Sequence, residues 1–342
     1  MHTQQDGALL SAEAPWPSVG TASDAWPREK LSAALTYARE QRTSGLIILE
    51  KGQIIAEEYW PVKAGVVYRQ LAGPTLPDGR GREDVASMQK SIVGALALMA
   101  QAQGRLRLEE PVSQYLKPGW SRATPEQERA ITVRHVMSMT SGLDTDYRFK
   151  AAPGTAWAYN TTVYSRMIAV LEAATGERIA PLTQRWLTGP LSMSESSWET
   201  RPWVSAGADA NTIGFVTSAR DMARFGLMLM ARGKTGPGKT IMRAEDVEAL
   251  TAPSQTLNPA YGLLWWSNRE TTLTSAGLKD KGLLFPHAPP QAWFALGALG
   301  RVLCIAPEQQ LIIVRLGAEP EAAFTDTLWR LLRDAMPEDA PP

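Results

Sequence analysis

The sequence predicts a discontinuous α/β domain with a helical insertion, because β-rich runs occur near both ends of the chain and helical periods occupy its middle. The clearest β signal is a pair of runs at 45–50 and 54–60 that flank Lys51-Gly52-Gln53, as in a hairpin. Further strands are expected late in the chain, at 261–266, 302–306 and 311–316. Strands from the two ends would then share one domain.

The helical periods end at glycines, which suit a helix C-terminus because they adopt the left-handed conformation without strain. These segments are 87–103, 133–139, 162–175 and 218–231, followed by Gly104, Gly142, Gly176 and Gly233. Two more helices are expected at 29–41 and 325–336. The predicted organisation is an extension over residues 1–27, an α/β domain formed by 28–80 with 245–342, and a mainly helical domain over 81–244.

Composition narrows the function classes. With 342 residues the chain can bury a substantial core. Thirty-five basic and thirty-five acidic residues cancel, which indicates neither a nucleic-acid nor a membrane-surface partner. The single cysteine, Cys304, excludes an internal disulfide and lies in an apolar stretch, as expected of a buried structural thiol. The expected partner is a small molecule, and nothing indicates an oligomeric state.

The first residues show no targeting pattern. Residues 1–20 contain no basic start followed by a sustained apolar core, so a secretory signal is not expected. The longest apolar stretch, 92–100, falls short of the roughly 20 residues that a membrane-spanning helix needs. We therefore expect a cytoplasmic protein without a membrane partner.

Ser87-Met88-Gln89-Lys90 is the candidate nucleophile motif. Ser87 falls where a helix is expected to begin, so Lys90 lies one turn further on the same face, within reach of the hydroxyl. The free N–H groups of a helix start favour an oxyanion and disfavour a charged lysine, which predicts a neutral Lys90 able to accept the serine proton. The alternative is a capping serine with a solvated lysine. The apolar neighbours Val85 and Ile92 argue against it, because a plain surface lysine would be costly there.

Several ordered stretches together resemble the class C β-lactamase-like family, which includes esterases, D-amino-peptidases and 6-aminohexanoate-dimer hydrolases. The stretches are 85–91, 104–112, 131–143, 153–161 and 176–179. The resemblance implies a three-layer α/β sandwich, with a mainly antiparallel sheet from both chain ends and an inserted all-α domain. It also implies acyl transfer without a cofactor or metal, with Ser87 as nucleophile.

The resemblance assigns the proton relay to Lys90 and Tyr159, since Tyr159 stands where the family has the tyrosine of a Tyr-x-Asn segment. Thr161 replaces the asparagine and is expected to bind the oxyanion or the substrate. Asn160 is offset by one position, so we assign Asn160 no role. A lysine ammonium nearby is expected to lower the pKa of Tyr159, which would make tyrosinate or a shared proton the base. Which of the two residues is the base stays open, and Tyr159 could instead be a loop aromatic that caps the core.

The family's third element is Lys-Thr-Gly or His-x-Gly on a strand lining the site. The matching stretch is 297–301, which lacks the cationic residue. Gly300 would let substrate approach the strand, and the Arg301 N–H could form an oxyanion hole with that of Ser87. An ordinary strand start that contains a glycine is an equally good explanation of both residues.

Other matches are weaker. Lys234-Thr235-Gly236 spells the third motif, and 233–240 matches the phosphate-binding Gly-x4-Gly-Lys-Thr pattern, which would indicate a nucleotide triphosphatase. Both follow a segment expected to be helical, where neither motif belongs. The three histidines are scattered, and His135 within a helical segment is interpreted as structural. Neither a Ser-His-Asp site nor a metal site is expected.

The expected activity is hydrolysis of a small-molecule ester or linear amide. Trp157 and Trp293 lie close to the motif segments and could line an aromatic cleft. A true β-lactamase or D-amino-peptidase is the alternative within the same chemistry. A catalytically silent binding or regulatory protein of the same fold is the alternative from another class.

Overall fold

A six-stranded antiparallel sheet built from both ends of the chain forms the centre of the protein. The computed structural model describes residues 16, 26–63, 65–205, 210–236 and 238–337. The strand order is β2-β1-β14-β13-β12-β9, so the first strand of the chain pairs with the last. The strands are β1 (Thr43–Glu50), β2 (Gln53–Tyr59), β9 (Trp266–Ser267), β12 (Trp293–Gly297), β13 (Arg301–Ala306) and β14 (Leu311–Gly317).

The expected hairpin at the start of this sheet is confirmed. Glu50 pairs with Gln53, which leaves Lys51 and Gly52 as a two-residue turn. Both turn residues have positive φ, 50° and 72°. That conformation matches the right-handed twist of the flanking strands, which explains why glycine is found there.

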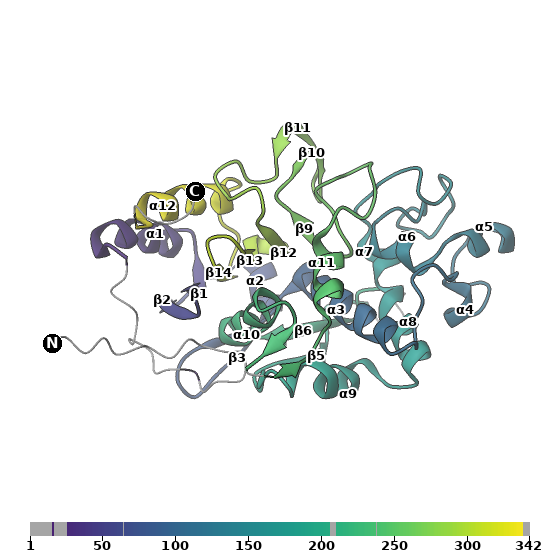
Figure 1. Ribbon diagram of the computed structural model, residues 1–342, viewed down its shortest axis with the longest axis horizontal. Helices are drawn as coiled ribbons and strands as arrows, with labels where there is room; N and C mark the ends of the chain where they lie inside the picture. The colour runs from purple at the N-terminus through teal and green to yellow at the C-terminus, as the bar shows by residue number, and fades with distance from the viewer. Residues whose placement is uncertain (1–15, 17–25, 64, 206–209, 237, 338–342) are drawn as a thin grey trace.

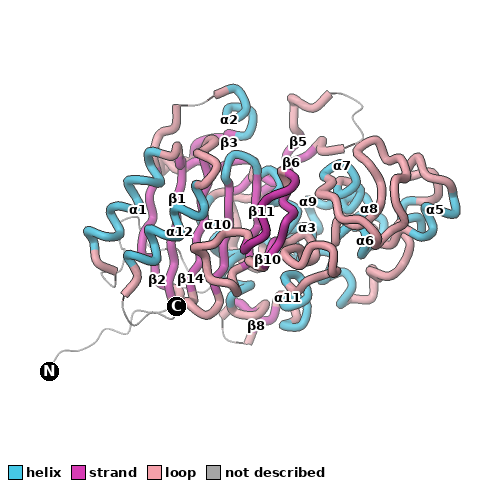
Figure 2. The backbone as a smooth tube through the Cα atoms, turned by 90° about the horizontal axis from the view of Figure 1, so that it is seen from above, coloured by secondary structure: helices cyan, strands magenta, loops and turns pink. Residues whose placement is uncertain are grey.

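Helices cover both faces of the sheet and make the three layers. On one face lie α1 (Arg28–Glu40) and α12 (Phe324–Ala335) (Figures 1 and 2). The rings of their Tyr37 and Phe324 stack with centroids 5.7 Å apart. On the other lies α10 (Ala219–Met230), against β1, β13 and β14. A Cβ at Gly226 would lie 3.0 Å from Leu303 Cδ1, so glycine lets α10 approach the sheet closely. The three-layer α/β sandwich expected from the sequence is confirmed.

The inserted helices lie beside this sandwich, around the almost wholly buried α3 (Gln89–Ala102) (Figure 1). Gly176 ends α8 in the left-handed conformation, with φ 74°, as expected of a C-terminal glycine. His135 completes a capping box with Thr132 at the start of α6, which accounts for it structurally. The other helices are α2 (Val66–Leu71), α4 (Ser113–Leu116), α5 (Pro125–Ala130), α6 (Val133–Met137), α7 (Thr161–Tyr164), α8 (Arg166–Thr175), α9 (Ile179–Thr183) and α11 (Ala244–Thr251), with a π-helical turn at Gln184–Thr188.

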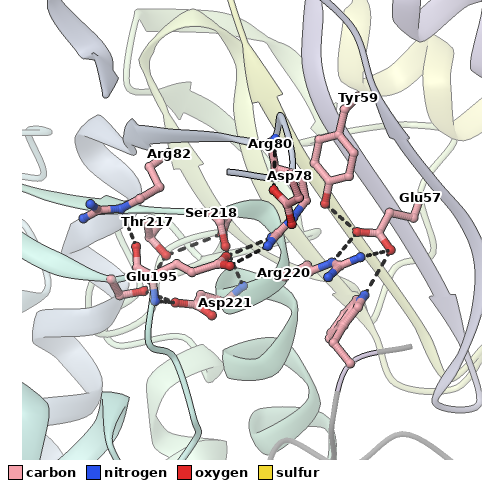
Figure 3. Close-up of polar contacts among 12 residues, drawn as sticks. Glu57, Tyr59, Asp78, Arg80, Arg82, Glu195, Thr217, Ser218, Arg220 and Asp221 are labelled. Atoms are coloured by element: carbon pink, nitrogen blue, oxygen red, sulfur yellow. Dashed lines mark hydrogen bonds and ion pairs between the residues drawn. The ribbon is translucent and has the colours of Figure 1, made fainter. Parts of the chain in front are cut away.

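A second, four-stranded antiparallel sheet leads into the nucleophile motif. No pattern in the sequence predicted this sheet. Its order is β3-β4-β6-β5. The strands are β3 (Ala72–Thr75), β4 (Gly81–Asp84), β5 (Ser197–Thr200) and β6 (Ile213–Thr217). Arg80, just before β4, forms ion pairs with Asp78 at 2.7 Å and Glu195 at 2.5 Å (Figure 3). Two hairpins complete the fold, β7 (Lys234–Thr235) with β8 (Lys239–Thr240) and β10 (Glu270–Thr274) with β11 (Gly277–Leu283).

Two expectations about the elements need correction. The strand expected at 261–266 is reduced to β9, because Leu264 has φ 63° and Tyr261 pairs back on Trp266 in a tight turn. In addition, α10 falls in the 81–244 segment but packs on the sheet of the α/β sandwich.

The ends of the chain are described only in part. Most of the 1–27 extension, and with it the segment tested for a targeting signal, lies outside the described residues. Of the extension, Trp16 donates a hydrogen bond to Glu57 and the buried Trp26 donates one to Glu50. Cys304 is buried with a free thiol, as expected. Among the described helices, none combines the length and apolar character needed to cross a bilayer.

Candidate active site

Ser87 lies in a 3₁₀ turn, Ala86–Met88, that joins β4 to α3. The sequence places it at a helix start, and the structure refines this, since the α-helix begins two residues later at Gln89. Ala86 has φ 50°, a left-handed conformation that a side chain disfavours, and its N–H donates to Asp84 Oδ1 at 2.8 Å. The turn leaves Ser87 partly exposed while the helix behind it is buried.

Lys90 lies directly behind Ser87. Its Nζ is 2.8 Å from Ser87 Oγ and 3.1 Å from Thr161 Oγ1, and the side chain is 2% exposed. The same Nζ faces the rings of Tyr159 and Tyr164, 4.8 and 4.7 Å from their centroids. Burial, together with the positive charge of Arg201, lowers the pKa of Lys90 to about 7. A large fraction of Lys90 is therefore neutral at neutral pH, chiefly through desolvation rather than through the helix start.

Tyr159 differs from the expectation in its electrostatics. Burial raises the pKa of Tyr159 to about 12, against a smaller opposite effect of a hydrogen bond with Ser87. The expected lowering by Lys90 is wrong, because Lys90 has a pKa of about 7 and is therefore neutral over the pH range in which a phenol loses its proton. Tyr261 and Trp266 enclose the ring, with centroids 6.2 and 5.8 Å away. Burial therefore favours the phenol over the tyrosinate form of Tyr159 at neutral pH.

The segment around Tyr159 explains the neighbouring positions. Asn160 caps α7, since its Oδ1 accepts from the Val163 N–H at 3.0 Å and its Nδ2 donates to Leu143 O at 3.0 Å. That leaves Thr161, the first residue of α7, to accept a hydrogen bond from Lys90. Trp157 packs edge-on against Trp266, with centroids 5.8 Å apart, so it belongs to the aromatic cluster around Tyr159. Trp293 packs instead on Trp265, 6.1 Å away.

The stretch matched to the third motif is a tight hairpin turn between β12 and β13. A side chain at Gly300 would point towards Pro320, because a Cβ there would lie 2.6 Å from Pro320 Cγ. It is Gly297 that lies close to the nucleophile segment, because a Cβ there would overlap Val85 O, two residues before Ser87. The role expected for Gly300 is therefore corrected, because the turn places Gly297 against the nucleophile segment.

The Arg301 side chain is fully buried and engaged away from Ser87. Its Nη2 donates to Glu83 at 2.6 Å and its Nη1 donates to Ala298 O at 3.1 Å. It therefore cannot replace the cation that the third motif lacks. Its backbone N–H as an oxyanion donor stays a prediction.

The Lys-Thr-Gly and phosphate-loop matches fall on the β7–β8 hairpin that follows α10. Lys234 and Lys239 are exposed there. A phosphate-binding loop requires a strand before it, whereas here the helix α10 precedes the match and the short strands β7 and β8 lie within it. The rejection of both matches agrees with this geometry.

Some residues around the site carried no recognisable signal in the sequence. Asp84 and Arg201 form a buried ion pair beside the turn, with Nε and Oδ2 2.7 Å apart. Arg201 lies far from Ser87 in the chain, so no local spacing could have indicated it. A cavity of about 740 Å³ extends from Asp84 between α2 and the segment after β5, and Leu71 and Trp203 are among its lining residues. Ser87, Lys90 and Tyr159 are not among the residues that line this cavity.

Comparisons with known proteins agree with the fold and identify the family. Esterase EstB of Burkholderia gladioli is 26% identical over 203 residues, 48% of this chain and 50% of that one. Among solved structures, EstCE1, a hydrolase with promiscuous acyltransferase activity, has a TM-score of 0.62 at 17% identity and covers 90% of this chain and 98% of its own. A D-stereospecific amidohydrolase from Streptomyces has a TM-score of 0.57 at 18% identity and covers 88% and 97%. The family model described as Beta-lactamase matches residues 31–335. The chain therefore belongs to the β-lactamase family of hydrolases.

Proposed function

We propose that this chain is a serine hydrolase that cleaves an ester or a linear amide through an acyl-enzyme on Ser87. The observation that carries the proposal is the 2.8 Å distance between the buried Lys90 Nζ and Ser87 Oγ. A neutral amine at that distance accepts the hydroxyl proton as Oγ forms its bond to the carbonyl carbon. The bond to the alcohol or amine then breaks, and water later releases the acyl group from Ser87.

The two titratable groups divide the proton transfers between them. Lys90, with a pKa of about 7, is the base that becomes protonated when Ser87 attacks. Tyr159, with a pKa of about 12, acts as a phenol that gives its proton to the leaving group and takes one from Lys90. This pairing leaves no net charge on either residue after acylation.

An ester or linear amide fits the surroundings better than a β-lactam. The carboxylate of a β-lactam calls for a cation on the third motif, and the stretch 297–301 offers only Arg301, which is held by Glu83. The esterase and amidohydrolase among the similar proteins support the same substrate class.

Substitution of Ser87 tests the proposal. Ser87→Ala should abolish hydrolysis of p-nitrophenyl butyrate while the protein stays folded, because a hydroxyl at a helix start contributes at most about 1–2 kcal/mol. A fluorophosphonate probe should add to the wild-type peptide that contains Ser87 and not to the variant. Hydrolysis by the variant at the wild-type rate would refute the nucleophile, and a wild type that is neither active nor labelled would indicate a silent binding protein.

A further inference from the structure

A buried ion pair lies beside the nucleophile turn and takes no part in the proton transfers of Ser87, Lys90 and Tyr159. Arg201 Nε lies 2.7 Å from Asp84 Oδ2 and Nη2 lies 2.8 Å from Oδ1, so the pair is bidentate. The two side chains are 5% and 3% exposed. Taking both charges out of water is costly, and an apolar pair would often be as stable. A specific geometric role would explain why charges are kept here.

The carboxylate holds the residue before Ser87. Asp84 Oδ1 accepts the Ala86 N–H at 2.8 Å, and Ala86 has φ 50°. A residue with a side chain leaves this conformation unless its surroundings hold it. The hydrogen bond to Asp84 is a direct restraint on that backbone, and Ser87 follows immediately.

The guanidinium holds the residues after Ser87. Arg201 Nη2 also donates to Gln89 Oε1 at 3.1 Å, and the same oxygen accepts the Phe215 N–H at 3.1 Å. The ion pair therefore ties together Asp84, at the end of β4, and Gln89, at the start of α3. Gly214 makes room for it, because a Cβ there would overlap Asp84 Oδ2.

The guanidinium also acts on Lys90, which follows Gln89. The groups that face Lys90 Nζ are the hydroxyls of Ser87 and Thr161 and the rings of Tyr159 and Tyr164. Among the described residues no carboxylate forms an ion pair with this lysine, and the positive charge of Arg201 works in the same direction as burial to lower its pKa.

We propose that Asp84 and Arg201 are positioning residues for the nucleophile and its base. The carboxylate holds the strained turn that presents Ser87, and the guanidinium, fixed by that carboxylate, presents a positive charge to Lys90. This role rests on the proposed function of Ser87 and Lys90. Neither residue touches the reacting atoms.

The first test asks whether the turn is restrained by Asp84. The readout is the second-order rate at which a fluorophosphonate modifies Ser87, and labelling of the wild type must first be shown, since its absence would refute the proposed function instead. Asp84→Ala should slow this rate by about 10- to 100-fold through misplacement of the nucleophile. Adding Ala86→Gly should recover most of the loss, because glycine adopts positive φ without strain.

Failure of that rescue in a folded protein, or no loss in Asp84→Ala, would overturn the restraint. Ala86→Gly alone should react at the wild-type rate. Thermal unfolding followed by circular dichroism confirms that each variant is folded.

The second test asks whether Arg201 acts on Lys90 or only supports the structure. It uses a double variant, so that neither Asp84 nor Arg201 is left as an unpaired buried charge. D84N/R201Q carries neither charge and keeps an amide oxygen for the Ala86 N–H. The pH midpoint of fluorophosphonate labelling should rise above the wild-type value, because the Arg201 charge that disfavours protonated Lys90 is gone.

Arg80→Met is the matched control, since Arg80 is a buried arginine that is paired with Asp78 and Glu195 (Figure 3), and its charge is not among the causes that lower the pKa of Lys90. It should leave the midpoint unchanged. An unshifted midpoint in D84N/R201Q, or an equal shift in Arg80→Met, would overturn the action of Arg201 on Lys90.

Discussion

The nucleophile turn and the β7–β8 hairpin both match motifs of serine hydrolases, yet they are opposite environments for a lysine. Lys90 is 2% exposed, and burial helps to lower its pKa to about 7. Lys234, in a Lys-Thr-Gly sequence, is exposed on a two-stranded hairpin after α10. Under the proposed function, a lysine acts as a base when it is desolvated and lies within hydrogen-bonding distance of a serine hydroxyl, and a three-residue sequence match supplies neither condition.

The largest expected effect comes from removing the buried lysine, Lys90, or its partner Tyr159. Lys90→Ala should lower kcat/KM for p-nitrophenyl butyrate by about 10²–10⁴, because the variant has no group to accept the Ser87 proton. Tyr159→Phe should cost about 10² or more, since it removes the phenol that passes the proton on. Losses of only a few-fold for both variants would mean that another group is the base.

Substrate preference tests whether the site contains a working third motif. A functional Lys-Thr-Gly would bind the carboxylate of a β-lactam. Charge-assisted contacts of that kind are worth on the order of 2–4 kcal/mol in the transition state, so nitrocefin should be cleaved about 30- to 1000-fold less efficiently than p-nitrophenyl butyrate. Both kcat/KM values are measured on one preparation. Nitrocefin cleaved as fast as the ester would show that a cation reaches the site, and the protein would then be a true β-lactamase.

Burial of Lys90 should also be visible in stability. The lysine titrates at about 10.4 when unfolded and at about 7 when folded, so between these values the unfolded chain binds more protons than the native one. The free energy of unfolding attributable to this group therefore rises with pH across that window, and the destabilisation is complete below about pH 7. Lys90→Met should be more stable than the wild type at pH 7 by roughly 3–5 kcal/mol.

That advantage should shrink as the pH rises from 7 towards 10. Urea unfolding of both proteins at several pH values measures it. A difference that stays constant with pH would contradict a shifted lysine.

The smallest effect is expected on the exposed side. Lys234→Ala should change kcat/KM by less than about twofold, because an exposed side chain on a connection contributes little to a distant site. The same ester assay measures it. Loss of activity in the folded variant would place the third motif in this hairpin and overturn the placement at 297–301.

The parts of the fold that could be predicted from the sequence are those that depend on local residue patterns. The Lys51-Gly52 turn and the helix that Gly176 ends both follow from residue types at fixed positions. The β3–β6 sheet could not be predicted in this way, because its strands have four or five residues and are separated by most of the helical region.

The site divides in the same way. The spacing of Ser87 and Lys90 on one face follows from the helical repeat. The pKa of Tyr159 does not, since it depends on Tyr261 and Trp266, which reach it only in the folded chain. Arg201 likewise becomes a neighbour of Asp84 only through tertiary packing.

Titration of the lysine side chains by NMR tests most directly whether burial makes Lys90 a base. In protein labelled at the lysine side chains, one resonance should titrate with a midpoint near 7 and should be missing from Lys90→Met. If the Lys90 resonance instead titrated at about 10.4, the ordinary value of a lysine, Lys90 would be an ammonium throughout the working range and could not accept the proton of Ser87.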